Sequence, residues 1–281
     1  MLKAENIHVD LGRTTILHGI DLAAHAGRVT AIIGPNGSGK TTLMRALTGE
    51  IAFEGSATLN GVDIAGAQPW QLAAMRGVLP QSAMLAFPFT VHEVVRLGLT
   101  SGIMGADGDD LVVEALKAVD LGGFEARFYQ ELSGGEQQRV QLARVLCQVW
   151  EPLLNDVPRF LFLDEPVSSL DIKHQLQIMR IAADYAARGG GVLAIMHDLN
   201  LTAAFSDHVV LISDGRVFAA GKPPDVLTSG NLERVYDCPM RIGSAPDGNG
   251  MLVLPDLAAA AQPIDHQNRA SRDWNHATSG R

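Results

Sequence analysis

The sequence has few of the features that mark a secreted, membrane-spanning or nucleic-acid-binding protein. Its 281 residues include two cysteines, Cys147 and Cys238, which lie far apart and follow no metal-binding spacing. We therefore expect free thiols and a reducing compartment. The N-terminus lacks the apolar core of a signal peptide, and no apolar run approaches the ~18 residues of a membrane span. We expect a chain that is soluble by itself and that reaches a membrane only through a partner.

Positive charge is also scarce. The chain has 22 Lys and Arg residues against 31 Asp and Glu, for a net charge of −9. This balance excludes nucleic acid as the main partner, because phosphate contacts need a basic face. With 47% hydrophobic residues, the chain can bury a sizeable core, and its length allows one large domain or two small ones.

The most informative stretch is Gly34-Pro35-Asn36-Gly37-Ser38-Gly39-Lys40-Thr41, which fits the G-x-x-x-x-G-K-[ST] pattern of a P-loop. A predicted buried strand at 29–33 precedes it and a predicted helix follows it from Thr42. The glycines let backbone N–H groups surround an anion, and the helix N-terminus adds its dipole. Lys40 can reach the β- and γ-phosphates, and the Thr41 hydroxyl can bind Mg²⁺. The alternative is a glycine-rich turn with an incidental lysine, and both flanking elements argue against it.

The patterns on either side of the P-loop predict two different substructures. Residues 1–33 and 55–61 read as short strands, the second closed by an Asn-Gly turn, and predict a small antiparallel sheet beside the P-loop core. Residues 84–150 include a T-x-x-E capping box at 90–93 and a stretch of helical spacing at 110–121. This block predicts a helical insertion in an α/β core.

After the insertion, predicted strands and helices alternate again. Apolar runs at 160–163 and 192–196 predict buried strands of a parallel sheet, and a helix is predicted between them at 171–188. A hairpin with an Asp-Gly turn is predicted at 209–219. From Pro255 onward there is no periodicity, and we expect the last ~20–25 residues to be mobile.

Two carboxylates, Asp164 and Glu165, follow the predicted strand at 160–163. The carboxyl ends of parallel strands form the edge of a sheet where ligands bind. Asp164 can support the Mg²⁺ shell directly or through water, and Glu165 can orient and polarise an attacking water. Many strands end in aspartate, so this pair gains its weight from the P-loop that precedes it.

A second anion site is predicted at Leu132-Ser133-Gly134-Gly135-Glu136-Gln137-Gln138-Arg139. Ser133 and Glu136 form a capping box, which is the purely structural interpretation. Gly134 and Gly135 are poor helix formers, however, and glycines at a helix N-terminus let a phosphate approach bare N–H groups. One chain with two half-sites for one triphosphate predicts a head-to-tail dimer that holds two nucleotides around a two-fold axis.

Taken together, these motifs resemble the ATP-binding subunits of ABC transporters. The P-loop, Gln81, the signature at 132–139, Asp164-Glu165, the segment at 168–171 and His197 stand in that family's order, over residues 1 to 240. The resemblance implies an α/β fold with a P-loop NTPase core and a mostly parallel sheet. It also implies a small N-terminal antiparallel β subdomain, a helical insertion at 84–150 and a C-terminal extension at 241–281.

The resemblance further implies ATP and Mg²⁺ as cofactors and assigns residues to them. Thr41, Gln81 and Asp164 would hold the metal, and Glu165, His197 and Lys40 would act in catalysis. The nucleotide would be bound by Gly34, Pro35, Asn36, Gly37, Ser38, Gly39, Lys40, Thr41, Thr42, Gln81, Ser133, Gly134, Gly135 and Gln138.

Three of these family motifs have further implied roles or structural alternatives. Gln81 would also sense a membrane partner, and His197 would hydrogen-bond the γ-phosphate, although a histidine after a buried strand is often a satisfied core residue. Ser169-Leu170-Asp171 would link the two nucleotide sites, and Asp171 is equally a good N-cap for the helix at 171–188. The chain departs from the family at Leu11, where an aromatic residue usually stacks on adenine. The base would rest on Leu11 or on another nearby side chain.

A closer resemblance is to the ATPase subunits of heme (hemin) importers, carried by Leu79-Pro80-Gln81, by residues 87–98 and by the long link at 150–158. It implies ATP-driven heme import by a homodimer bound peripherally at the cytoplasmic face of the inner membrane. Two integral-membrane permease subunits and, indirectly, a periplasmic or surface solute-binding protein would be its partners. Iron-siderophore or cobalamin import is the alternative within transport.

Non-transport ABC ATPases form the rival class. A repair-type ATPase would carry a coiled coil between Lys40 and Ser133, and a translation-type protein would carry two P-loops; this sequence has neither. The stretch at 82–100, with Met84, Leu85, Phe87 and Phe89, is a candidate docking surface for the membrane partner. The two phenylalanines could equally pack inside the helical insertion.

Overall fold

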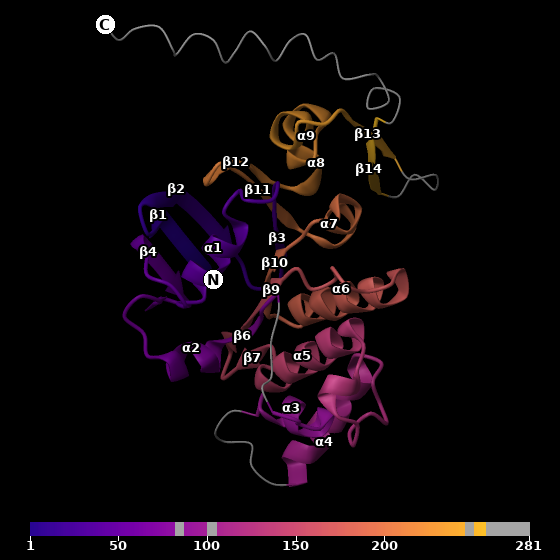
Figure 1. Ribbon diagram of the computed structural model, residues 1–281. Coiled ribbons are helices and arrows are strands. Elements are labelled where there is room, and N and C mark those ends of the chain that lie inside the picture. Colours follow the sequence, from indigo (N-terminus) through magenta and orange to yellow (C-terminus); the bar gives the residue numbers. More distant parts are fainter. Residues whose placement is uncertain (82–86, 100–105, 245–249, 257–281) are drawn as a thin grey trace, which may run out of the picture.

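The computed structural model describes residues 1–81, 87–99, 106–244 and 250–256 (Figure 1). An antiparallel sheet of four strands lies beside the central sheet and has the order β2-β1-β4-β5. Its strands are β1 (Leu2–Leu11), β2 (Thr14–Ala24), β4 (Glu54–Leu59) and β5 (Val62–Asp63). The predicted N-terminal antiparallel sheet is thereby confirmed, including the Asn60-Gly61 turn, in which both residues have positive φ.

The central sheet has six strands in the order β12-β11-β3-β10-β9-β6. Neighbouring strands are parallel except for β11 and β12, which form the predicted hairpin. The strands are β3 (Val29–Ile33), β6 (Arg76–Leu79), β9 (Phe160–Asp164), β10 (Gly191–Ile195), β11 (His208–Ser213) and β12 (Arg216–Gly221). The carboxyl ends of β3, β9 and β10 therefore meet at one edge, which brings the P-loop, Glu165 and His197 together.

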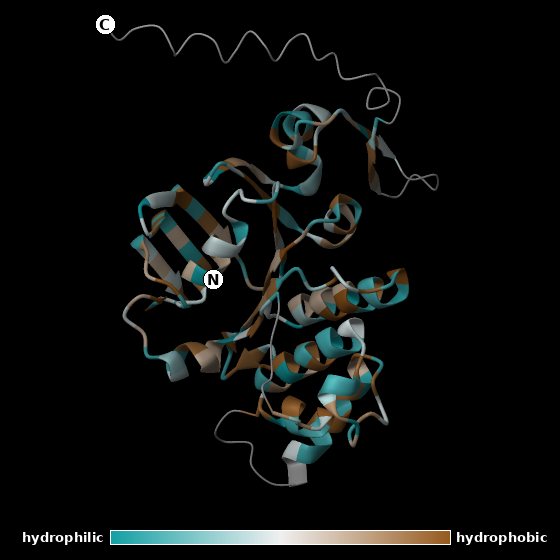
Figure 2. Cartoon of the chain, viewed as in Figure 1, coloured by the Kyte–Doolittle hydropathy of each residue, from teal (hydrophilic) through white to brown (hydrophobic). Residues whose placement is uncertain are grey.

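Both faces of the central sheet are buried, and alternate side chains serve different cores. On β9, Phe160 and Phe162 join the core shared with the antiparallel sheet, whereas Leu161 and Leu163 join the core beneath the helices. The central strands are accordingly hydrophobic along their length (Figure 2). This double burial explains the continuous apolar runs in the sequence.

The helices cover the two faces of this sheet unequally. α1 (Lys40–Leu47) packs between the two sheets, whereas α6 (Ile172–Ala187) and α7 (Leu199–Phe205) pack on the opposite face. α2 (Pro69–Met75) precedes β6. The helical insertion contains α3 (Val91–Arg96), α4 (Ala106–Ala118), the short 3₁₀ helix η1 (Tyr129–Glu131) and α5 (Gly134–Gln148). No helix in the described ranges is long and apolar enough to cross a membrane.

Helix caps are the best-predicted local features. The capping boxes at Thr90 and Ser133 both form, and Asp171 caps α6 by accepting the His174 N–H at 2.9 Å. Phe89 packs partly buried against the core of the insertion, as the packing interpretation predicts, while Phe87 is exposed. The two other candidate docking residues, Met84 and Leu85, lie outside the described residues.

Two hairpins were not predicted from the sequence. The link at 150–158 contains a small one, β7 (Leu153–Leu154) with β8 (Val157–Pro158). After α8 (Pro223–Val226) and α9 (Ser229–Tyr236) comes a second, β13 (Met240–Ser244) with β14 (Met251–Pro255). The second hairpin occupies the start of the expected C-terminal extension. The final stretch expected to be mobile lies beyond the part of the chain that the structure describes.

Candidate active site

The P-loop lies between β3 and α1, as its sequence pattern predicts. Gly34 has a φ of 151° and Gly39 a φ of 101°, and a β-carbon at Gly34 would lie 2.1 Å from the carbonyl oxygen of Ile212. Only glycine fits there. Lys40 is buried, and its Nζ donates to the carbonyl oxygens of Gly34 at 2.8 Å and Pro35 at 2.9 Å. The Lys40 ammonium therefore lies inside the P-loop.

A cleft of about 630 Å³ opens at this edge of the sheet. It brings together residues from β2, the P-loop, the end of β6, β9 and β10, and nine of its ten lining residues were predicted as site residues. The lining consists of Ile16, Asn36, Gly37, Gly39, Lys40, Thr41, Thr42, Gln81, Glu165 and His197. Burial lowers the pKa of Lys40, and the carboxylates of Glu165 and Asp164 oppose that shift. The cleft therefore combines a buried cation, backbone N–H groups and carboxylates, which suits a phosphate ester bound with a metal ion.

Glu165 and His197 form a pair across this cleft. The Nε2 atom of His197 lies 2.6 Å from Oε1 of Glu165. Glu165 adopts a left-handed backbone conformation, with φ of 52°, which side-chain-bearing residues rarely adopt. Its backbone is held by four hydrogen bonds. Its N–H donates to the carbonyl of Ile195, and its carbonyl accepts from the Gln138 amide and from both the hydroxyl and the N–H of Ser168. Such strain, held in place by its surroundings, is common at functional sites.

Asp164 lies directly behind this pair and is 5% exposed. Burial, reinforced by the neighbouring Glu165, raises the pKa of Asp164 to about 6, while Lys40 and His197 act in the opposite direction. Its Oδ1 atom is buried and has no hydrogen-bond partner among the described residues. A buried carboxylate oxygen without a partner is the kind of donor that Mg²⁺ prefers, and the oxygen donors of Thr41 and Gln81, which line the cleft, are of the same kind.

The signature residues line a different cleft of about 480 Å³. Ser133 caps α5, with its hydroxyl 2.6 Å from Glu136 Oε2 and its N–H 2.8 Å from the same oxygen. Gly134 is exposed, and a β-carbon there would meet nothing within 4 Å. The lining also includes Ser169, Leu170 and Asp171, which were predicted to link two sites. The two clefts share no lining residue.

Two residues that were considered as nucleotide contacts, Gln138 and Leu11, do not line the P-loop cleft. Gln138 is on α5, but its Nε2 donates to the Glu165 carbonyl at 3.1 Å and it lines neither cleft. Leu11 is 46% exposed at the end of β1 and is not part of the cleft lining. Ile16 of the paired strand β2, which was not predicted, does line the cleft. The apolar Ile16 directly after two threonines was the only sequence signal for it.

Comparisons with known proteins agree with this geometry. The sequence model of the family described as "ABC transporter" matches residues 17–168, more than half of the chain. A "Hemin import ATP-binding protein HmuV" from Jannaschia sp. (strain CCS1) is 58% identical over 96% of this chain and 99% of its own length. Another protein of that name, from Mesorhizobium japonicum, is 57% identical over 91% of this chain and 98% of its own length.

Solved structures are similar in the same way. An ATP-binding cassette of an ABC transporter, MJ1267 in its ADP conformation, superposes with a TM-score of 0.71 at 25% identity, covering 84% of this chain and 98% of that one. The cassette MJ0796, solved as a dimer bound to ADP and phosphate, gives a TM-score of 0.69 at 26% identity, covering 79% and 99%. These neighbours confirm the predicted P-loop NTPase fold with its parallel-rich sheet. The sequence match, the shared fold and the two clefts together show that the chain belongs to the ABC transporter ATP-binding family.

Proposed function

We propose that this ATPase is the ATP-hydrolysing subunit of a hemin importer. The observation that carries the proposal is the division of one chain into two separate clefts. One holds the P-loop, Glu165 and His197, and the other holds the signature residues Ser133 to Gly135. In the proposed head-to-tail dimer each P-loop cleft faces the partner's signature cleft, so that two nucleotides are enclosed and their hydrolysis reopens the pair.

Within one site, different residues bind the phosphates, hold the metal ion and activate the attacking water. The P-loop N–H groups and Lys40 bind the β- and γ-phosphates. Thr41, Gln81 and Asp164 would hold Mg²⁺, which supplies positive charge to the phosphate oxygens during transfer. Glu165 orients the attacking water and accepts its proton. His197, already 2.6 Å from Glu165, fixes that carboxylate and offers its imidazole to the γ-phosphate.

Replacing Glu165 with glutamine tests the site. Glu165→Gln keeps the size of the side chain but removes the base, so ATP turnover should fall by about 100-fold or more while ATP still binds. Phosphate release measures turnover, and light scattering with ATP and Mg²⁺ should show a trapped dimer. Glu151→Gln is the matched control, because Glu151 pairs with Arg188 on the surface, away from the cleft. Normal turnover by Glu165→Gln, or a monomer under trapping conditions, would refute the assignment.

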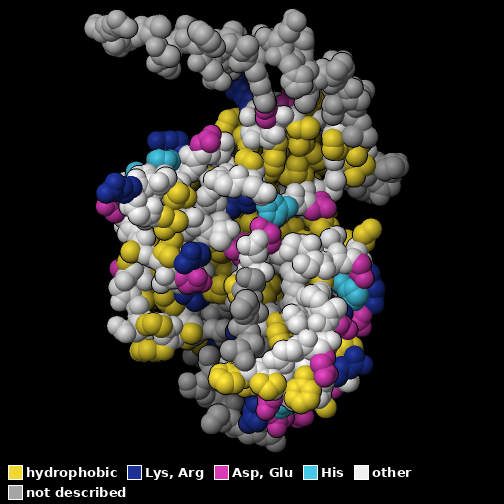
Figure 3. All heavy atoms as spheres, in the orientation of Figure 1, with side chains coloured by type: hydrophobic (Ala, Val, Ile, Leu, Met, Phe, Trp, Pro, Cys, Tyr) yellow, Lys and Arg dark blue, Asp and Glu magenta, His cyan; other side chains and the backbone are white. Residues whose placement is uncertain are grey.

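The membrane partner is proposed to dock on the helical insertion. Phe87, Leu97 and Phe128 expose 68%, 58% and 46% of their surface. Hydrophobic side chains also gather on the lower part of the visible face, over the insertion (Figure 3). Exposed apolar groups of this size are typical of interaction sites. The proposed partners are two permease subunits, supplied with cargo by a solute-binding protein, with this chain peripheral at the cytoplasmic face of the membrane.

The choice of hemin is supported by relatives that are named hemin import ATP-binding proteins and are 52–58% identical to this chain. The test is transport by the complete complex in proteoliposomes containing ATP, with hemin, a ferric siderophore and cobalamin supplied in parallel. We expect ATP-dependent uptake of hemin alone. Uptake of the siderophore or of cobalamin instead would reassign the cargo while leaving the ATPase chemistry intact.

A further inference from the structure

His197 lies between the end of β10 at Ile195 and the N-cap of α7 at Asp198, so the start of this short helix is one of the two elements that position the histidine. Asp198 is the N-cap of α7, and its Oδ1 accepts the backbone N–H groups of Asn200 and Leu201, both at 2.8 Å. α7 has only seven residues. Helices this short have little stability of their own, so the contacts of α7 with its neighbours must fix its orientation.

The strongest directional contact of α7 is made by the side chain of Asn200. Its Nδ2 donates to the carbonyl of Val253 at 3.2 Å, and its Oδ1 accepts the Val253 N–H at 2.8 Å. Val253 lies in β14, opposite Ile242 of β13. The amide of Asn200 therefore binds the outer edge of β14 as the backbone of another strand would. β14 runs beside α7 (Figure 1).

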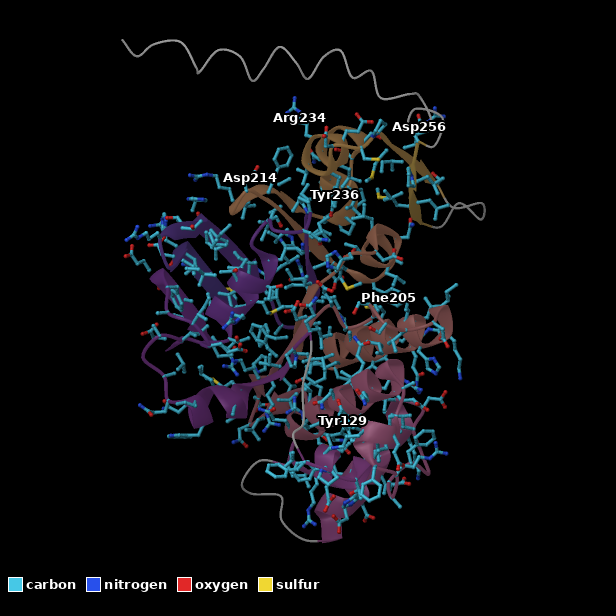
Figure 4. All side chains as sticks on the ribbon, in the orientation of Figure 1. Tyr129, Phe205, Asp214, Arg234, Tyr236 and Asp256 are labelled. Atoms are coloured by element: carbon cyan, nitrogen blue, oxygen red, sulfur yellow. The ribbon has the colours of Figure 1, made fainter. Side chains whose placement is uncertain are left out.

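The hairpin that carries Val253 is itself anchored. Tyr236, at the end of α9, lies on the side of that helix that faces the central sheet (Figure 4). Burial raises the pKa of its phenol to about 12, and the backbone of Gly34 in the P-loop lies close enough to the phenol to oppose that rise. The N–H of Met240, where β13 begins, donates to Glu233 at 3.3 Å. Arg241 of β13 and Asp256, directly after β14, form an ion pair at 2.7 Å that joins the two strands. The hairpin thus connects α7 to a fixed point beside the P-loop.

We propose that the C-terminal hairpin β13–β14 is a positioning element for His197, acting through the paired hydrogen bonds between Asn200 and Val253. The inference rests on the proposed role of His197 and adds to it a function for the C-terminal segment. Asn200 touches neither nucleotide cleft, so it is a positioning residue. With its two bonds in place, α7 holds the imidazole at Glu165. Without them, α7 pivots at Asp198 and the imidazole spends less time in that position.

Asn200→Ala is the direct test, because alanine suits the exposed face of a helix and removes both bonds. We expect kcat for ATP hydrolysis to fall about 3- to 10-fold, which corresponds to about 0.7–1.4 kcal/mol and is part of the net stabilisation that the two hydrogen bonds provide. The KM for ATP should change by less than about 2-fold, because the P-loop is untouched. Asn231→Ala is the matched control. Its amide donates to the Val226 carbonyl at 3.0 Å and so joins α9 to α8, with no part in the contact between α7 and β14, and kcat should not change.

A double-mutant cycle separates positioning from general loosening. Single-turnover rates, measured with enzyme in excess, allow the slow His197→Ala background to be compared. If Asn200 acts through His197, Asn200→Ala should slow that background by less than about 1.5-fold. Amide hydrogen exchange in residues 197–205 should rise in Asn200→Ala and not in Asn231→Ala.

Each result has a definite meaning. An unchanged kcat in Asn200→Ala, an equal loss in the His197→Ala background, or no rise in hydrogen exchange would overturn the inference. Normal turnover by His197→Ala would instead refute the proposed role of the histidine. A slow His197→Ala variant combined with a normal Asn200→Ala variant would leave the proposed function standing and reject this inference alone.

Discussion

Replacing Gly134 with alanine should affect the stability of α5 and the turnover of ATP in opposite directions. Gly134 is the first residue of α5, is exposed, and has open space where a β-carbon would lie. Alanine is better than glycine in a helix interior by about 1 kcal/mol, and by less in the first turn. The free energy of unfolding of Gly134→Ala should therefore stay the same or rise by about 0.5 kcal/mol.

ATP turnover should nevertheless fall. In the proposed dimer the phosphates of the partner's nucleotide approach the N–H groups of this first turn, and a methyl group there would hold them off. Losing one hydrogen bond to a charged group costs about 1.5–3 kcal/mol, which corresponds to a fall in kcat/KM of about 10- to 100-fold. ATP binding to the monomer should be unchanged, since the P-loop lines the other cleft.

Urea unfolding, phosphate release and ATP binding to the monomer measure these three quantities separately. Gly230→Ala is the matched control: Gly230 lies in the first turn of α9, is exposed, and also has no atom within 4 Å of its β-carbon position. It should show the same small change in stability with normal turnover. If Gly134→Ala hydrolysed ATP at the normal rate, the signature cleft would not be a phosphate site. If it lost monomer binding, the division into two clefts would be wrong.

Two further substitutions test the P-loop cleft. Lys40→Ala removes the buried cation that faces the phosphates and should lower ATP turnover by at least about 100-fold; normal phosphate release would reject the site. Asp164→Asn tests the raised pKa of Asp164, about 6 against its usual 3.8. Because the buried carboxyl loses its proton at higher pH in the folded chain than in the unfolded chain, its charge destabilises the native state as pH rises from 4 to 6. The stability of Asp164→Asn relative to wild type, from urea unfolding in EDTA, should therefore increase by about 1–3 kcal/mol between pH 4 and pH 7. If the difference in stability between Asp164→Asn and wild type did not change with pH, the raised pKa of Asp164 would be wrong.

Much of the fold and of the P-loop cleft could be predicted because the relevant signals are local. A P-loop is contiguous, and its flanking strand and helix are visible in the same window of sequence. The double burial of β9 shows as a run without polar residues, and the caps at Thr90, Ser133 and Asp171 follow from residues three apart. Asp171 illustrates why a structural interpretation need not exclude a functional one, since it caps α6 and also lines the signature cleft.

What could not be predicted depends on contacts between distant segments. Ile16 reaches the cleft at a register shift in the pairing of β2 with β1, between the Val9–Leu17 and Asp10–Thr15 pairs, and no local sequence pattern predicts it. The β13–β14 hairpin is short. Val253 is buried and Ile242 is partly buried because α7 packs on β14 and α9 packs on β13. Gln138 was predicted to face the nucleotide, but the strained backbone of Glu165 leaves a carbonyl within its reach.

That last bond bears on how the two clefts communicate within one chain. Gln138 belongs to the signature helix α5, and the Glu165 carbonyl that it binds also accepts from the Ser168 hydroxyl at 3.2 Å. Ser169 then lines the signature cleft, only four residues after Glu165. A rotation of the helical insertion therefore moves the backbone of Glu165 with it unless the bond to Gln138 breaks. If the permease docks on that insertion as proposed, movement of the membrane partner would reach the carboxylate proposed as the catalytic base through α5.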